Sequence, residues 1–124
     1  MGDKRKMTEE STLKEILHIH ENYEKEGGKC IKPSFNFIVV CTNTDDFIVT
    51  KTLQQAKDKA IEYGKKMNEI FDIYEVVLYP DNTYRASIRF YFFPNENDLR
   101  EDNSIKDCMH IAWRTRGALL EVVE

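Results

Sequence analysis

The stretch from Thr52 to Phe93 constrains the fold most, because it predicts one amphipathic helix followed by a hairpin of two long strands. The helix begins with Thr52-Leu53-Gln54-Gln55, a capping box in which the Thr52 hydroxyl accepts from a backbone N–H and the Gln55 side chain reaches back. Apolar side chains then recur every three or four positions, on one face: Leu53, Ala56, Ala60, Tyr63, Met67 and Ile70. We expect this face to cover a sheet, and the small alanines to allow a close approach.

Two segments rich in β-branched and aromatic residues follow, 73–79 and 83–93, joined by the turn sequence Pro80-Asp81-Asn82. If Tyr79 pairs with Thr83, the alternation of side chains along the two strands defines two faces. The face predicted to form the core carries Tyr74, Val76, Leu78, Tyr84, Ala86, Ile88, Phe90 and Phe92. The outer face mixes charges with aromatic rings and carries Glu75, Val77, Tyr79, Arg85, Ser87, Arg89 and Tyr91.

The remaining segments predict further elements on either side of this unit. A polar stretch over 1–11 is expected to be flexible, and a second capping box predicts a helix over 12–26. Residues 35–41 form an almost continuous apolar run, which is typical of a central strand buried on both faces. Residues 47–50 predict either a short strand paired with that run or an extended lead-in to the helix.

The C-terminal third predicts an acidic loop over 94–102, followed by a helix that begins at Asn103 and ends at Gly117. Residues 118–123 could be a closing strand or a continued helix. Together these elements predict a single α+β domain over 12–124, with a mainly antiparallel sheet of three to four strands, two helices on one face and an extra N-terminal helix. The order is either βαββαβ, as in ferredoxin-like folds, or ββαββα. Neither order indicates an activity.

Composition excludes several classes of protein. The net charge of −4 over 124 residues argues against a dedicated binder of double-stranded DNA, although it allows a local basic patch. No apolar run approaches the roughly 20 residues that span a membrane, and the first ten residues lack the apolar segment of a secretory signal. Three widely spaced cysteines predict reduced thiols and a cytoplasmic location: Cys30, Cys41 and Cys108.

No motif predicts catalysis, a cofactor or a metal. His18 and His20 are two positions apart on a predicted helix, so their side chains point away from each other, and the same holds for Cys108 and His110. The acidic segment 95–102 does not match a calcium-binding loop, because Arg100 stands where the turn requires glycine. A small enzyme that uses Cys108 or an acidic pair is the least favoured of three functional hypotheses.

The arginines supply the candidate binding residues. Of six in the chain, five lie at or after position 85: Arg85, Arg89, Arg100, Arg114 and Arg116. Arg85 and Arg89 share the predicted outer face with Tyr79 and Tyr91, and this combination can stack bases and hold phosphates. The alternative is ordinary cross-strand pairing of these arginines with Glu75 on a solvated face.

Trp113, the one tryptophan, lies beside Arg114 and close to Arg116 on the predicted C-terminal helix. It marks either the edge of the core or an interface hot spot. We therefore predict a non-enzymatic binding module, a regulatory or inhibitory accessory protein that contacts another protein or a second copy of itself. The alternative is binding of a nucleotide or single-stranded nucleic acid. The candidate residues are the same for both: Tyr79, Arg85, Arg89, Tyr91, Trp113, Arg114 and Arg116.

Overall fold

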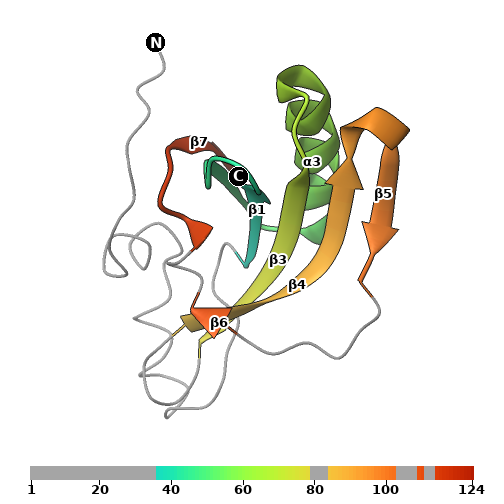
Figure 1. Ribbon diagram of the computed structural model, residues 1–124. Helices are drawn as coiled ribbons and strands as arrows, with labels where there is room; N and C mark the ends of the chain where they lie inside the picture. Colours follow the sequence, from blue (N-terminus) through green and yellow to red (C-terminus); the bar gives the residue numbers. More distant parts are fainter. Residues whose placement is uncertain (1–35, 79–83, 103–108, 111–113) are drawn as a thin grey trace.

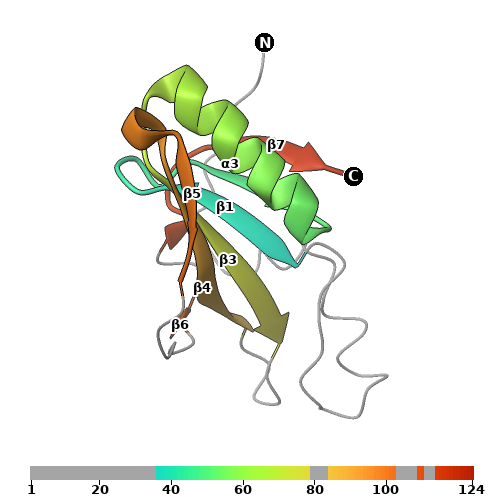
Figure 2. The same cartoon turned by 90° about the vertical axis from the view of Figure 1, so that its right-hand side faces the viewer.

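A computed structural model describes residues 36–78, 84–102, 109–110 and 114–124, so the helix predicted over 12–26 and the turn at 80–82 lie outside the described residues. Within these ranges, seven strands form one mixed sheet and helix α3 (Leu53–Met67) lies across one of its faces (Figures 1 and 2). The sheet order is β5-β4-β3-β1-β2-β7, and β6 pairs with the edge of β4 opposite β3, the edge that β5 also uses. The strands are β1 (Phe37–Cys41), β2 (Phe47–Thr50), β3 (Phe71–Leu78), β4 (Tyr84–Phe93), β5 (Asp98–Glu101), β6 (Met109–His110) and β7 (Leu119–Val123).

The predicted fold class is wrong. Instead of three to four mainly antiparallel strands under two helices, the described residues form a larger mixed sheet with one α-helix. The segment predicted as an acidic loop forms the 3₁₀ turn η1 (Pro94–Glu96) and then β5, which is antiparallel to β4. The helix predicted over 103–117 is contradicted at Met109–His110, where the backbone pairs with β4. Residues 119–123 form β7, whose parallel pairing with β2 makes the sheet mixed.

The central unit follows the local signals closely. Residues 47–50 form a strand that is antiparallel to β1, and β1 is also antiparallel to β3, so β2 and β3 are parallel with β1 between them. Helix α3 is the crossover between these two parallel strands, which makes a split βαβ unit. Its capping box is confirmed, because the Thr52 hydroxyl accepts from the Gln55 N–H at 3.1 Å and Gln55 Oε1 accepts from the Thr52 N–H at 3.1 Å.

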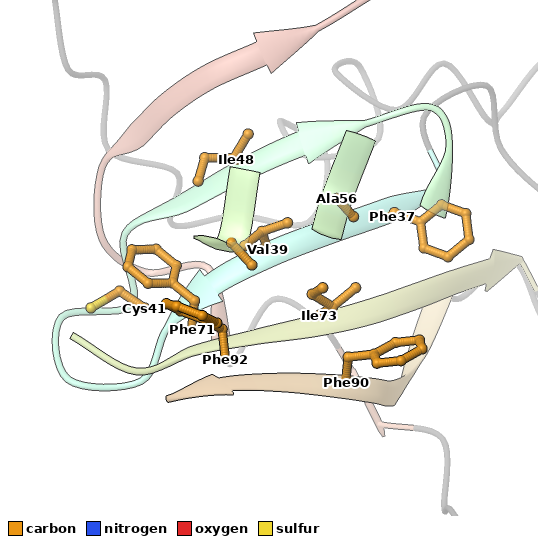
Figure 3. Close-up of a cluster of buried hydrophobic side chains, with 10 residues drawn as sticks. Phe37, Val39, Cys41, Ile48, Ala56, Phe71, Ile73, Phe90 and Phe92 are labelled. Carbon is orange, nitrogen blue, oxygen red and sulfur yellow. The ribbon is translucent and has the colours of Figure 1, made fainter. Parts of the chain in front are cut away.

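The register of the β3–β4 hairpin is the predicted one up to Tyr74, which pairs with Ile88. The next pair is Ile73 with Phe90, so Arg89 is an extra residue in β4 and forms a β-bulge. Residues beyond the bulge therefore change faces, and the side chains that these two strands bury in the cluster under α3 are Phe71, Ile73, Phe90 and Phe92 (Figure 3). The predicted core face is wrong in this respect, because it grouped Phe90 and Phe92 with Tyr74.

Both faces of the central strands are buried. On the α3 side, the helix contributes Ala56 and Ala60 to a cluster with β1 and β2 residues such as Val39 and Ile48. Side chains that alternate with this cluster point to the opposite face, and they are at most 2% exposed: Ile38, Val40, Phe47, Val49, Tyr74, Val76 and Ala86. The prediction that the apolar run at 35–41 is buried on both faces is confirmed for its described part, 36–41.

Helix α3 passes so close to β4 that Gly64 has no room for a side chain, since a Cβ there would overlap the buried ring of Phe92. We expect Gly64→Ala to lower the free energy of unfolding by up to about 2 kcal/mol, because an overpacking cost of about 1–3 kcal/mol is only partly offset by a helix-propensity gain of about 1 kcal/mol. Chemical denaturation measures this change. In a double-mutant cycle, Phe92→Leu should reduce the cost of Gly64→Ala, and additive costs would contradict the close approach.

Candidate functional site

Three side chains lie together on the face of β4 and β5 that points away from α3. Because Phe92 is buried under α3, Tyr91 and Phe93 on either side of it point to the opposite face, where both are half-buried. Their ring centroids are 6.2 Å apart. The exposed guanidinium of Arg100, on β5, lies 4.4 Å from the centroid of the Phe93 ring. We call Tyr91, Phe93 and Arg100 the β4–β5 patch.

Carboxylates fix the polar ends of this patch. The Tyr91 hydroxyl donates to Asp102 Oδ2 at 2.8 Å, and Arg100 donates through Nε to Asp98 Oδ2 at 2.6 Å and also through Nη2 to Glu96. The pKa of Tyr91 is raised to about 12, so the phenol stays neutral near pH 7. Desolvation is the larger cause of this rise, and the hydrogen bond to Asp102 is the next largest. The patch therefore combines preorganised rings with a rim of three carboxylates and one guanidinium.

A buried ion cluster adjoins the patch. Asp72 of β3 pairs in register with Tyr91 and is 4% exposed. Its Oδ2 lies 3.4 Å from Nη2 of Arg114, and Nε of Arg114 lies 3.4 Å from Oδ1 of Asp45 in the turn after β1. The same guanidinium lies 5.8 Å from the ring centroid of Tyr74. Asp72 thus links Tyr91 on one side to Arg114 and Asp45 on the other.

This cluster is incompletely satisfied. Asp72 Oδ1 and Arg114 Nε are both buried without a hydrogen bond. Burial raises the pKa of Asp72 from 3.8 to about 6, although the positive charge of Arg114 acts in the opposite direction. Burial also raises the pKa of Tyr74 to about 12, and the charge of Asp72 adds to that rise. Because the Asp72 carboxylate is enclosed, it suits a structural or proton-sensitive role better than direct contact with a substrate.

The structure brings together two of the seven predicted binding residues, Tyr91 and Arg114, through Asp72. Arg89 lies apart from them, because it is the bulge residue and its Nη1 binds Glu75 Oε1 at 2.5 Å. The alternative interpretation of Arg89 as a partner of Glu75 is therefore confirmed. Arg116 is exposed. The predictions for Tyr79, Trp113 and the Arg85 side chain fall outside the described residues.

Three residues at this site were not among the sequence candidates: Asp72, Phe93 and Arg100. Phe93 is two positions from Tyr91 in the same strand, which already places the two rings on one face. Asp72 was visible as one of two charges, with Glu75, in the otherwise apolar sequence of β3. Arg100 was noted among the C-terminal arginines, but nothing placed it in a strand, because the four residues of β5 include only one apolar side chain.

Other features of the described residues suggest less chemistry. A shallow groove of about 240 Å³ lies between the second half of α3 and β7, lined by Tyr63, Lys66, Met67 and Leu120. Cys41 is fully buried. Nowhere in the described ranges do three or more His, Cys, Asp or Glu side chains gather as they would around a metal ion. No helix there has the length and apolar character that crossing a bilayer requires.

Comparisons with known proteins add no further assignment: no protein family, no curated protein and no solved structure matches this chain.

Proposed function

We propose that the protein is a non-enzymatic binding module that docks a partner protein with a basic surface on the β4–β5 patch. The observation that supports this most is the cluster of Tyr91, Phe93 and Arg100, which is partly exposed and yet held in place on two paired strands. Tyrosine and arginine are enriched among interface hot spots. Side chains that are already fixed lose little conformational entropy on binding, so more of their contact energy remains as affinity.

The charge around the patch favours a basic partner. Glu96, Asp98 and Asp102 carry more negative charge than Arg100 compensates, so cationic side chains of a partner would meet a complementary rim. Lysine or arginine side chains could also stack on the faces of Tyr91 and Phe93. A second copy of this chain offers less complementarity, since the chain carries a net charge of −4.

The aromatic rings also suit the alternative, a nucleotide or a single-stranded nucleic acid, because bases stack on such platforms. However, Arg89, Arg100 and Arg114 each pair with carboxylates of this chain. A phosphate would have to displace those carboxylates and approach the acidic rim, which opposes it electrostatically. The two proposals therefore differ in the sign of charge that the patch attracts.

Fluorescence anisotropy with two labelled probes tests this difference: a short Lys/Arg-rich peptide and a short single-stranded oligonucleotide, each at low and moderate salt. We expect the wild-type protein to bind the peptide, and Phe93→Ala to weaken that binding at least tenfold, as the loss of a hot spot does. Ile70→Ala is the matched control, because it removes an exposed apolar side chain outside the patch and should change the affinity less than twofold.

The opposite pattern would contradict the proposal. If the oligonucleotide binds more tightly than the peptide, and that binding falls steeply with salt and is lost in Phe93→Ala, the patch is a nucleic-acid site. If the peptide binds equally well to wild type, Phe93→Ala and Ile70→Ala, the partner does not use the patch.

A further inference from the structure

The segment 114–118, which leads into β7, is docked on the turn between β1 and β2. The Gly117 N–H donates to the Asp45 carbonyl at 3.1 Å, and the Ala118 N–H donates to Asp46 Oδ1 at 2.8 Å. The Ala118 carbonyl in turn accepts from the Phe47 N–H at 2.9 Å. Arg114 adds side-chain pairing, because its guanidinium bridges Asp45 in this turn and Asp72 in β3.

This docking matters for β7, the strand that ends the described sheet on the β2 side. β7 has five residues and pairs with β2 in parallel, a geometry slightly less stable per residue than antiparallel pairing. Its Glu121 contacts α3 through Tyr63 Oη at 3.0 Å and Lys59 Nζ at 3.0 Å, and Leu120 and Val123 pack on the core cluster. A short strand at the edge of the described sheet belongs to the low-stability end of a fold, so the docked segment before it helps to keep it in place.

We propose that Asp72, Arg114 and Asp45 form a proton-sensitive latch on the C-terminal segment. While Asp72 is ionised, it holds Arg114 and so keeps β7 docked against β2. When Asp72 is protonated, Arg114 keeps only its weaker contact with Asp45, and β7 detaches more often. This inference concerns the C-terminal strand and stands independently of the proposed binding function.

The charged and titratable groups around Asp72 indicate that Asp72 is the group whose protonation controls the latch. Among the described residues, the turn after β1 contributes Asp45, the C-terminal segment contributes Arg114, and β3 and β4 contribute the phenols of Tyr74 and Tyr91. Both phenols have a pKa raised to about 12 and stay neutral between pH 5 and 8. The Asp102 carboxylate accepts a hydrogen bond from the Tyr91 hydroxyl.

Linkage supplies the direction of the switch. Arg114 opposes the burial-driven rise in the pKa of Asp72 to about 6, so docked Arg114 favours the ionised carboxyl. By reciprocity, the ionised carboxyl favours docked Arg114 as long as Asp72 stays enclosed between β1 and β4 when the segment leaves. Lowering the pH through that range then removes this preference. The Arg114 side chain is 25% exposed, although its Nε is buried.

Amide hydrogen exchange of the full chain, corrected for the intrinsic pH dependence of exchange, tests the latch. We expect protection of the β7 amides to fall several-fold to tenfold from pH 7.5 to pH 5, while amides of β3 and α3 keep theirs. Asp72→Asn should show low β7 protection at both pH values. Asp58→Asn, which removes an exposed carboxylate of α3, should behave as the wild type does.

Arg114→Gln gives an independent measurement, because it removes the other half of the pair. It should leave β7 weakly protected and insensitive to pH, with α3 and β3 protection showing that the variant folds. The latch is refuted if β7 protection in the wild type does not respond to pH. It is equally refuted if both variants retain the protection that the wild type shows at pH 7.5.

Discussion

Lowering the pH from 7.5 to 4.5 should stabilise the wild-type protein relative to Asp72→Asn by about 2 kcal/mol. The pKa of Asp72 is raised from 3.8 to about 6 in the folded protein, chiefly by burial, so the folded state binds this proton more tightly than the unfolded state. The resulting stability is fully present below pH 3.8 and is lost as the pH rises through about 6. Since Asp72 is 4% exposed, solvent screens the effect little.

Chemical denaturation of both proteins at pH 7.5, 6 and 4.5 measures this difference. The comparison between the two cancels the contributions of the other titrating groups, which both proteins share. Asp58→Asn serves as the control. It removes an exposed carboxylate, so the stability of this variant should follow the wild-type pH profile. Parallel pH profiles for wild type and Asp72→Asn would show that Asp72 is not a buried carboxyl with a raised pKa.

Greater global stability at low pH is compatible with a looser β7. Global unfolding exposes Asp72 itself, so it reports the gain from neutralising a buried charge. Opening of β7 is a local event in which the rest of the sheet remains folded, and it reports the loss of the pairing with Arg114. Denaturation and hydrogen exchange should therefore move in opposite directions as the pH falls, and this divergence is a specific signature of the cluster.

The elements that the sequence predicts correctly are those whose structure depends on residues close to one another in the sequence. The capping box at Thr52 and the small residues Ala56 and Ala60 act within one helix, and their signals lie within a few residues of each other. The initial register of the β3–β4 hairpin likewise follows from a short connection. The fully apolar β1 indicated burial on both faces because no alternation interrupts it.

The elements that the sequence misses are decided by distant contacts. The bulge at Arg89 lets Phe90 and Phe92 join the cluster under α3, and nothing in the local alternation of β4 marks that change of face. The four residues of β5 and the two of β6 become strands because the backbone of β4 pairs with them. Spacing that suits a helix around Met109 could not compete with that pairing.

The candidate site shows the same division. Tyr91 and Arg114 could be named because tyrosine and arginine are common at binding surfaces, whatever their surroundings. That they meet at Asp72 could not be predicted, since Arg114 lies 42 positions along the chain from Asp72. Charge balance at the patch also depends on strand β5, which brings Asp98 and Arg100 beside β4. Composition therefore indicates the residue types at the site but does not decide which ligand charge they favour.

Gly117→Ala should lower the free energy of unfolding by about 3 kcal/mol and should expose the β7 amides to exchange at every pH. A Cβ at Gly117 would lie 2.6 Å from the backbone carbon of Asp45 and 2.6 Å from the backbone nitrogen of Asp46. These backbone atoms cannot move aside as a flexible side chain can. The Asp46 carbonyl accepts a hydrogen bond from the Cys41 N–H at 2.8 Å, which holds the backbone of the β1–β2 turn in place. Overpacking of about 1–3 kcal/mol therefore adds to the loss of hydrogen bonds worth about 1 kcal/mol each.

Lys65→Ala is the control for this change, because it alters an exposed side chain of α3 outside the segment and should shift the free energy of unfolding by less than about 0.5 kcal/mol. If Gly117→Ala folds with unchanged stability and unchanged β7 protection, the C-terminal segment is not packed against the turn at 45–46. The latch geometry would then fail as well, because Arg114 reaches Asp45 and Asp72 from this segment. If Gly117→Ala detaches β7 while α3 and β3 stay protected, the segment is the mechanical link between the buried ion cluster and the strand that ends the sheet.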